Sequence, residues 1–372
     1  MKAEKLVEII GADFYTGVPD SQLAPLCGYL ANVYGRDPHH HITGANEGNC
    51  VAIAAGYYFA TGKVPVVYLQ NSGEGNIINP VASLTNDNVY AVPTVFVIGW
   101  RGEPGVHDEP QHIYQGKVTL KLLEDMDIEY FVIGKDTADS EAEAAMAGYR
   151  KLLDCGKSVA FVIKKGALTF GTDVKYENCN TMSREDAIRH ILKVTGDDAV
   201  VSSTGKISRE VFEIREESKD THRRDFLTVG SMGHSSGIAL GIAINKPGKK
   251  IWCIDGDGAA LMHMGAMATI GSIAPANLVH IIINNGSHES VGGMPTTATE
   301  LSFADTAKSL KYPSAVCVSS FEELDAALEN AKKSKSLCLI EVMCKIESRK
   351  NLGRPTTSAK ENKKNFMEFL KS

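Results

Sequence analysis

The chain has no long hydrophobic run, no closely spaced cysteine pair and no excess of positive charge. No stretch of about 18 apolar residues occurs in the sequence, so it predicts no transmembrane helix. The eight cysteines are scattered without a C-x-x-C pair, so neither a zinc site nor an iron–sulfur site is predicted. The formal net charge of −6 argues against general binding to nucleic acid, which depends on clustered Lys and Arg. Any anionic ligand must be held by a local site.

The first residues, MKAEKLVEIIGADFY, predict an amphipathic helix and contain no apolar signal-peptide region. We therefore expect a cytoplasmic protein with reduced, mostly buried thiols. The apolar content of 43% is that of a globular protein with substantial cores, and the length of 372 residues suggests two domains.

Short β-rich runs alternate with helical stretches along the chain, which predicts an α/β fold with parallel sheets. The strand candidates of the first half are ADFYTGV, KVPVVYLQ, VPTVFVIG, EYFVIG and SVAFVIKK. Those of the second half are DAVVSSTG, DFLTVGSMG, KKIWCIDGDG, LVHIIINNG, AVCVS and LCLIEVMC. We predict two doubly wound domains, residues 1–170 and 183–345, joined by a linker over residues 171–182.

The final segment, residues 346–372, has a different character. From Lys345 onward the chain carries eight Lys or Arg against three Glu, a local charge of +5. Two interpretations remain open: a solvated basic tail, or an arm that packs near an anionic ligand.

Polar clusters follow two consecutive strand candidates of the second half. Gly256, Asp257 and Gly258 end the first strand, and Asn285 ends the next. The carboxyl ends of parallel strands meet at one edge of a sheet, so Asp257 and Asn285 are expected to share a ligand. Their side-chain oxygens and the backbone carbonyl of Ser287 form a suitable oxygen set for Mg²⁺. The two glycines allow a diphosphate to approach the backbone at a helix N-terminus.

A lone G-D-G is usually a turn, but G-D-G followed after about thirty residues by N-N closely resembles the signature of thiamine-diphosphate enzymes. A dinucleotide-binding fold is the obvious competitor, yet no G-x-G-x-x-G follows an early strand in either half. The resemblance implies thiamine diphosphate and Mg²⁺ as cofactors. It also implies that a bulky apolar residue in FLTVGSMGHSSGIALGIAI supports the bent cofactor, a position held here by Met232. Further cofactor contacts are expected from Gly205, Lys206, Ser231 and Ala259.

The first half contains ITGANEGNCVAIAAGYYFATGK, in which Glu47 begins a helix of mostly small or apolar residues. An exposed first-turn glutamate would contribute only a few tenths of a kcal/mol through the helix dipole. The segment, however, looks like the family's glutamate segment, in which the carboxyl hydrogen-bonds the aminopyrimidine ring and promotes formation of the thiamine ylid. The resemblance therefore makes Glu47 the principal catalytic candidate. A buried carboxyl group there is expected to have a raised pKa.

The short two-domain layout is similar to the phosphonopyruvate decarboxylases, with the sulfopyruvate decarboxylases as near relatives. TGVPDSQLAPL, NSGEGNIINPVASL, GWRGEPGVHDEPQH, NNGSHESVGGMPT and KNLGRPTT carry this similarity. It implies conversion of 3-phosphonopyruvate to 2-phosphonoacetaldehyde and CO₂ in phosphonate biosynthesis. Asp20 and His112 are the expected proton-handling residues, with His107 and His288 as alternatives.

A phosphonate group requires several cationic or N–H donors. Arg101 is the first candidate, and an exposed Arg101 that forms a weak surface ion pair is the alternative. Asn71, Ser72 and Arg354 are the other substrate-binding candidates. The consecutive His39, His40 and His41 are assigned no function, because neighbouring side chains rarely converge on one ion.

In this family the pyrimidine domain of one subunit faces the diphosphate domain of another, so a homo-oligomer is expected. We predict no membrane or nucleic-acid partner. Sulfopyruvate decarboxylase or another small 2-oxo acid decarboxylase or carboligase is the main alternative. A non-enzymatic nucleotide- or phosphate-binding module is more distant, since a pure binder has no use for a buried acid at Glu47. A 2-oxo acid oxidoreductase subunit is disfavoured, because the sequence has no cysteine cluster to carry electrons.

Overall fold

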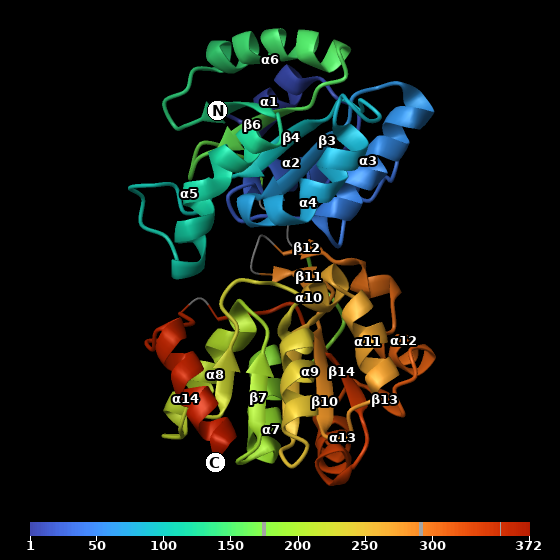
Figure 1. Ribbon diagram of the computed structural model, residues 1–372, viewed down its shortest axis with the longest axis vertical. Coiled ribbons are helices and arrows are strands. Elements are labelled where there is room, and N and C mark those ends of the chain that lie inside the picture. Colours follow the sequence, from blue (N-terminus) through green and yellow to red (C-terminus); the bar gives the residue numbers. More distant parts are fainter. Residues whose placement is uncertain (173–175, 290–292, 350) are drawn as a thin grey trace. The chain divides into compact units, whose positions relative to one another are not determined.

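The computed structural model describes residues 1–172, 176–289, 293–349 and 351–372 (Figure 1). The chain forms two compact units, Met1–Lys175 and Tyr176–Ser372. Each unit has a six-stranded sheet with helices on both faces, so the predicted α/β class is confirmed. The boundary between the units lies inside the predicted linker, residues 171–182.

Unit 1 follows a regular alternation of strands and helices. Its elements are α1 (Ala3–Ile10), β1 (Tyr15–Gly17), α2 (Ala24–Tyr34), β2 (His41–Thr43), α3 (Glu47–Thr61), β3 (Val66–Gln70), the 3₁₀ turn η1 (Asn71–Gly73), α4 (Glu74–Pro80), the π-helical turn η2 (Val81–Thr85), β4 (Val95–Gly99), α5 (Pro110–Asp125), β5 (Glu129–Ile133), α6 (Asp139–Asp154) and β6 (Val159–Ile163).

The sheet of unit 1 is parallel, in the order β2-β1-β3-β4-β6-β5. Right-handed crossovers place α2 and α6 on one face, together with α1, and α3, α4 and α5 on the other. The central strands β4 and β6 are buried along their whole length, as expected of apolar runs covered on both sides. Because the strands are parallel, the carboxyl ends of β1, β3 and β4 lie at the same edge of the sheet.

Unit 2 repeats this architecture without repeating the sequence. Its elements are α7 (Arg184–Thr195), β7 (Ala199–Ser202), α8 (Lys206–Glu217), β8 (Asp225–Leu227), α9 (Ser235–Asn245), β9 (Ile251–Gly256), α10 (Asp257–Met262), α11 (Gly265–Ile273), β10 (Leu278–Asn284), β11 (Ser287–His288), β12 (Met294–Pro295), the 3₁₀ turn η4 (Thr297–Glu300), α12 (Phe303–Ser309), β13 (Ser314–Val318), α13 (Phe321–Lys333), β14 (Cys338–Met343) and α14 (Ala359–Lys371).

The main sheet of unit 2 is also parallel, in the order β13-β14-β10-β9-β7-β8. One core lies between this sheet and α7, α8 and α13, and a second lies beneath α9, α11 and α12. Strands β9 and β10 are neighbours, and Ile283 pairs with Gly256 at their carboxyl ends. This register brings the G-D-G and N-N motifs to the same edge of the sheet.

Three features were not predicted from the sequence. The edge strand β2 lies in the HHHITG run, and His41 donates or accepts a 2.9 Å hydrogen bond with the hydroxyl of Tyr68. The short antiparallel pair β11–β12 follows the N-N motif. The last helix, α14, packs on β8, where the Asn362 side chain bonds the backbone of both Asp225 and Leu227. The basic C-terminal segment is therefore not a solvated tail along its whole length.

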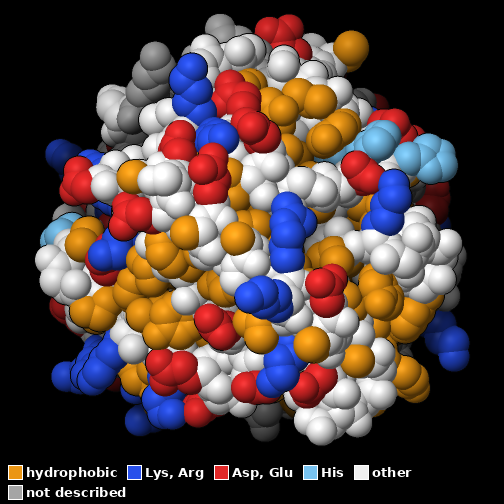
Figure 2. Space-filling view, turned by 90° about the horizontal axis from the view of Figure 1, so that it is seen from above, with side chains coloured by type: hydrophobic (Ala, Val, Ile, Leu, Met, Phe, Trp, Pro, Cys, Tyr) orange, Lys and Arg blue, Asp and Glu red, His pale blue; other side chains and the backbone are white. Residues whose placement is uncertain are grey.

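In the part of the chain that the structure describes, no helix is long and apolar enough to cross a membrane. All eight cysteines have free thiols, and Cys27, Cys50, Cys253, Cys338 and Cys344 are buried. On the face shown in Figure 2, acidic and basic side chains are interspersed with groups of hydrophobic ones, without a continuous field of one charge.

Two glycines at the middle of unit 1 helices provide a test of this packing. A Cβ atom added at Gly116 in α5 would lie 1.9 Å from the carbonyl oxygen of Gly102, whereas one added at the exposed Gly148 in α6 would meet nothing within 4 Å. We expect Gly116→Ala to lower the free energy of unfolding by about 1–3 kcal/mol through overpacking. The matched Gly148→Ala should raise it by about 0.5–1 kcal/mol. Urea unfolding of both variants measures this, and equal effects would contradict the close approach of α5 to residues 101–102.

Candidate active site

A cavity opens in unit 2 where β7, β9 and β10 end. Its volume is about 120 Å³. Many of the residues predicted to bind the cofactor line it, although Ser231 is not among the lining residues and is exposed. The lining residues are Arg184, Ser203, Thr204, Gly205, Lys206, Ile207, Met232, Gly256, Asp257, Gly258, Ala259, Ile283, Asn285, Ser287, His288 and Glu289.

The predicted metal ligands lie together in the wall of this cavity. Asp257 begins α10 and is buried, and the hydroxyl of Thr296 donates a 2.7 Å hydrogen bond to its Oδ2. Burial raises the pKa of Asp257 to about 6, against the hydrogen bonds that it accepts. The Oδ1 atom of Asn285 accepts a 3.0 Å bond from the backbone N–H of Ser287. Residues with carboxylate and amide oxygens, the kind of ligand that a hard divalent cation binds, thus line one cavity.

Glycine at position 258 keeps this wall open. A Cβ atom there would lie 3.1 Å from the ring of His288 and 3.4 Å from the methyl group of Met232. Gly205, at φ +87°, has a backbone conformation that favours glycine and directly precedes α8. The buried His288 has its pKa lowered to about 4, so its imidazole is neutral near pH 7.

The cavity also contains an ionic network that the sequence interpretation missed. Arg184 makes a bidentate pair with Glu210, with N···O distances of 2.8 and 2.7 Å, and a further ion pair with Glu289. Glu289 also accepts bonds from Lys206 at 3.2 Å and from Nδ2 of Asn285 at 2.9 Å. No motif marks Arg184 or Glu210, which become neighbours of the site only when α7 packs against α8.

The catalytic candidate Glu47 lies in unit 1, at the first position of α3. Asn46 caps this helix by accepting a 2.8 Å bond from the N–H of Gly48. The carboxyl group is buried, and Nδ2 of Asn76 donates a 2.6 Å bond to its Oε2. Burial raises the pKa of Glu47, although the bond from Asn76 opposes this. A Cβ atom at Gly73 would lie 2.5 Å from Glu47 Oε1, so the NSGEGN segment is folded closely around the acid.

Asp20 is fully buried beyond the end of β1. Its Oδ2 accepts backbone bonds from Gln22 and Leu23, at 2.9 and 3.3 Å. Its Oδ1 has no hydrogen-bond partner among the described residues. Burial raises the pKa of Asp20 to about 6, partly offset by these bonds and by the nearby Arg101. A buried carboxyl group of this kind can carry a proton at moderately acidic pH.

Arg101 is neither exposed nor available as an isolated cation. Its guanidinium makes a bidentate pair with Asp108, at 2.8 and 2.5 Å, and donates a third bond of 3.0 Å to the hydroxyl of Ser21. The expectation of a weak surface ion pair is therefore wrong, because both partners are mostly buried. Among the bonds of the described residues, three of the five guanidinium N–H groups are used.

Asn71 is fully buried and holds two loops together. Its Nδ2 donates 2.8 Å bonds to the carbonyl of Arg101 and to the hydroxyl of Thr119, and its Oδ1 accepts from the N–H of Arg101. Both amide N–H groups are used, so Asn71 cannot donate to a phosphonate without breaking one of these bonds. Its predicted substrate-binding role is not supported by this geometry. Ser72 is exposed, and its hydroxyl accepts a 2.7 Å bond from Gln70.

The remaining candidates are less constrained by the structure. His112 is half-buried in the first turn of α5, whereas His107 is exposed in the preceding loop. Arg354 is exposed and lies in unit 2. No motif predicted a second buried acid, Glu74, whose pKa is raised to about 8 by burial and which accepts a 3.3 Å bond from Gln115.

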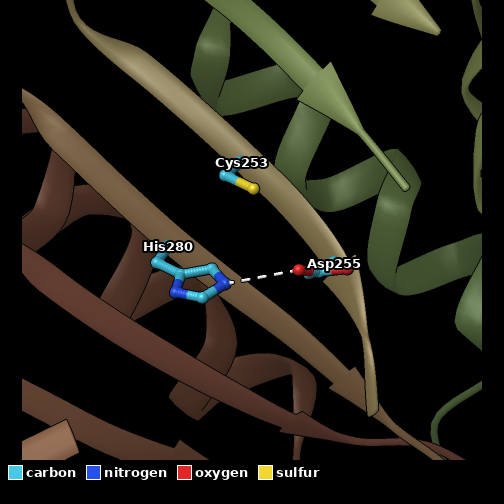
Figure 3. A group of neighbouring side chains, drawn as sticks. All are labelled: Cys253, Asp255 and His280. Atoms are coloured by element: carbon cyan, nitrogen blue, oxygen red, sulfur yellow. Dashed lines mark ion pairs between the residues drawn. The ribbon is translucent and has the colours of Figure 1, made fainter. Parts of the chain in front are cut away.

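A separate polar group lies in the sheet core rather than in the cavity wall. Cys253 and Asp255 project from β9 and His280 from β10, all fully buried on the same side of the sheet (Figure 3). The Nε2 atom of His280 lies 3.7 Å from Oδ2 of Asp255. This group belongs to the strands whose ends carry Asp257 and Asn285.

Two protein-family models match this chain. The N-terminal thiamine-pyrophosphate-binding domain of thiamine pyrophosphate enzymes matches residues 3–124, and the C-terminal binding domain of these enzymes matches residues 203–342. Phosphonopyruvate decarboxylase from Streptomyces viridochromogenes is 32% identical, covering 97% of this chain and 92% of that protein. This chain belongs to the thiamine-diphosphate-dependent decarboxylase family.

This chain is also similar to sulfopyruvate decarboxylases. The protein from Methanosarcina acetivorans is 27% identical, covering 99% of this chain and 97% of its own length. Two Methanococcus maripaludis proteins, named as the beta and alpha subunits of sulfopyruvate decarboxylase, each match 32% of this chain at 36% identity.

The decarboxylase uses thiamine diphosphate, with Mg²⁺ as the usual metal of the family. The residues present fit both groups. Asp257 and Asn285 would supply the oxygen donors, and the absence of side chains at Gly256 and Gly258 would leave room for a diphosphate at the start of α10.

We expect the free energy of unfolding to depend on pH, because the carboxyl group of Asp20 is buried. Its folded pKa of about 6 lies above the usual value of 3.8, so the folded chain binds this proton more tightly than the unfolded chain. The corresponding stabilisation is complete below about pH 4 and is lost as the pH rises through 6. We expect Asp20→Asn to raise the free energy of unfolding by about 1–3 kcal/mol at pH 8, with little effect at pH 4.

Urea unfolding at both pH values measures this difference. The control is Asp136→Asn, which changes an exposed aspartate of the same unit. A gain from Asp20→Asn that is the same at both pH values would contradict the assignment of a raised pKa.

Proposed function

We propose that this decarboxylase converts 3-phosphonopyruvate to 2-phosphonoacetaldehyde and CO₂. The observation that carries the proposal is the 32% identity to phosphonopyruvate decarboxylase over nearly the whole of both chains. The grouping of Asp257, Asn285 and Ser287 in one cavity and the burial of Glu47 support the cofactor chemistry that this reaction requires.

When bound, thiamine diphosphate supplies the sink for the electrons released with CO₂. Asp257, Asn285 and the Ser287 carbonyl are the proposed metal ligands, and Met232 is the proposed apolar support. Oε2 of Glu47 accepts the bond from Asn76, so Oε1 is the proposed proton-exchanging atom. Its raised pKa suits proton exchange with a ring nitrogen of the cofactor.

We assign the protonation that follows decarboxylation to Asp20, with His112 as the second candidate. Asp20 combines full burial, a pKa of about 6 and an Oδ1 atom without a partner among the described residues. The neighbouring Arg101 is the proposed phosphonate-binding residue, since its pair with Asp108 fixes the orientation of the guanidinium while two N–H groups are not used by the bonds described. Ser72 and Arg354 remain weaker candidates.

We also propose a homo-oligomer in which two copies complete the active site. In unit 1, α3 and α4 expose Ile53, Phe59 and Ile78 beside the glycines at 56 and 75, where a Cβ atom would meet nothing within 4 Å. In unit 2, α9 and α11 expose Ile244 and Ile273 beside Gly237, Gly241 and Gly265. Exposed apolar helix faces with small residues allow close helix packing, and sedimentation of the purified protein measures the assembly.

Free thiols are consistent with the proposed cytoplasmic location.

Sulfopyruvate is the second candidate substrate, because a sulfopyruvate decarboxylase aligns over 99% of this chain. The two substrates differ in charge, since a phosphonate can carry one more negative charge than a sulfonate. Assays with thiamine diphosphate, Mg²⁺ and phosphonopyruvate, sulfopyruvate or pyruvate decide between them. We expect phosphonopyruvate to give the highest kcat/KM, and a higher value for either competitor would overturn the assignment.

Two substitutions separate the roles of the two acids. Glu47→Gln should reduce kcat by at least about 100-fold while cofactor affinity is largely retained, because only a proton-exchanging group is lost. Asp257→Ala should abolish binding of the Mg²⁺–cofactor complex itself, since it removes an anionic metal ligand. Calorimetric titration of cofactor measures binding, and steady-state assays measure turnover. Normal activity in the Glu47→Gln protein would exclude this mechanism.

A further inference from the structure

The segment between β14 and α14 is bonded to both α7 and α8. We call residues 345–349 and 351–354 the strap. Arg209 of α8 donates to the carbonyl groups of Leu352 and Gly353, the latter at 2.6 Å. In return Glu213, also on α8, accepts bonds from the N–H of Gly353 and from Arg349. The strap is therefore attached to the helix whose first residue lies in the cavity wall.

The strap has further points of attachment. Arg349 also donates a 2.8 Å bond to Glu185 of α7, and Leu352 is buried. Beyond the strap, Phe366 of α14 is buried in the core formed with α9 and α12. These contacts involve both side chains and backbone groups of the strap, which is more than a loose surface loop requires.

One residue of the strap extends this attachment to the cofactor cavity. The ammonium group of Lys206 donates a 2.5 Å bond to the hydroxyl of Ser348. It also donates to the carbonyl oxygen and to Oε1 of Glu289, at 3.3 and 3.2 Å. A lysine has three N–H donors, so these three acceptors account for all of them and define where the charge lies. To bind an anion, the ammonium group must exchange one of its two Glu289 acceptors for it, while the bond to Ser348 keeps it in place.

The position of this charge is coupled to the metal side of the cavity. Glu289 accepts a 2.9 Å bond from Asn285 and pairs with Arg184, so the groups that hold Lys206 also contact a proposed metal ligand. Because Lys206 is only partly exposed, its ammonium group depends on these partners for solvation. Removing one of them should change where the ammonium group points.

We propose that Ser348 and Arg209 are positioning residues of the cofactor site, through which the strap holds Lys206 ready to bind the diphosphate group. A cation that is already oriented loses less conformational freedom on binding an anion, so the strap increases affinity without contacting the ligand. The inference rests on the proposed function only through its cofactor, and not through its substrate.

The first test compares Ser348→Ala with the unmodified full-length protein. Calorimetric titration with Mg²⁺ and inorganic pyrophosphate, and then with Mg²⁺ and thiamine diphosphate, measures the affinity of the diphosphate site. We expect Kd to rise about ten-fold for both ligands, the size expected for one hydrogen bond to a charged group. Ser348→Thr retains the hydroxyl and should restore most of the affinity.

The control is Ser320→Ala, a second serine of unit 2. Its hydroxyl caps α13 by accepting a 3.2 Å bond from the N–H of Glu323, and Ser320 does not line the cavity. This variant should lower Tm because a helix cap is lost, while Kd stays unchanged. Ser348→Ala should show the opposite pattern. A purely structural role for Ser348 would instead lower Tm and leave Kd unchanged, which would overturn the proposal.

A second measurement does not depend on Ser348. Arg209→Gln should release the strap and raise Kd in the same direction, with retention of the fold checked by circular dichroism. Because coupling between two sites is reciprocal, Mg²⁺ with thiamine diphosphate should slow amide hydrogen exchange in residues 345–354 of the unmodified protein. Unchanged exchange together with an unchanged Kd would reject the coupling. Failure of the substrate assays with a normal Kd would reject phosphonopyruvate alone and leave this inference intact.

Discussion

The parallel pairing of β9 with β10 is the constraint on which the cofactor site depends. Because Gly256 and Ile283 are register partners, Asp257, one residue after Gly256, and Asn285, two residues after Ile283, arrive at the same sheet edge. A shift of the register by one residue would turn these side chains away from each other. The buried apolar runs of both strands keep this register, so the hydrophobic core of unit 2 also determines the geometry of the metal site.

Motifs that follow directly from strand ends were accessible to sequence reasoning. The G-D-G and N-N segments, the glycine at 258 and the acid at the start of α3 each depend on local order along the chain. The partners of these groups were not accessible. Arg184 and Glu210 occur in no recognisable pattern, and Asn76 lies in a segment of the family similarity without being marked as the partner of Glu47. The proximity of these partners arises from helices packing together after intervals of 26 to 29 residues in the sequence. The edge strand β2 was missed because HHHIT has little apolar alternation.

The substrate-binding candidates show what reasoning from residue type leaves out. Arg101 and Asn71 were chosen because a phosphonate needs donors, but donor capacity depends on what else a side chain bonds. Asn71 uses both amide N–H groups to join η1 to the loop after β4 and to α5. Arg101 is oriented by Asp108, seven residues away, whose role the sequence did not indicate. The hydrogen bonds of the described residues in the folded state show that Arg101 has N–H groups left for a ligand and that Asn71 does not. The residue type alone does not show this.

The buried carboxyl group of Asp20 has a consequence for the thermodynamics of the whole chain. Between its unfolded and folded pKa values, the folded chain holds a proton at Oδ that the unfolded chain has released. Folding near pH 5 therefore withdraws close to one proton per chain from the solvent through this group. The heat of folding then includes the ionisation heat of the buffer, so two buffers at the same pH yield different enthalpies for the same conformational change.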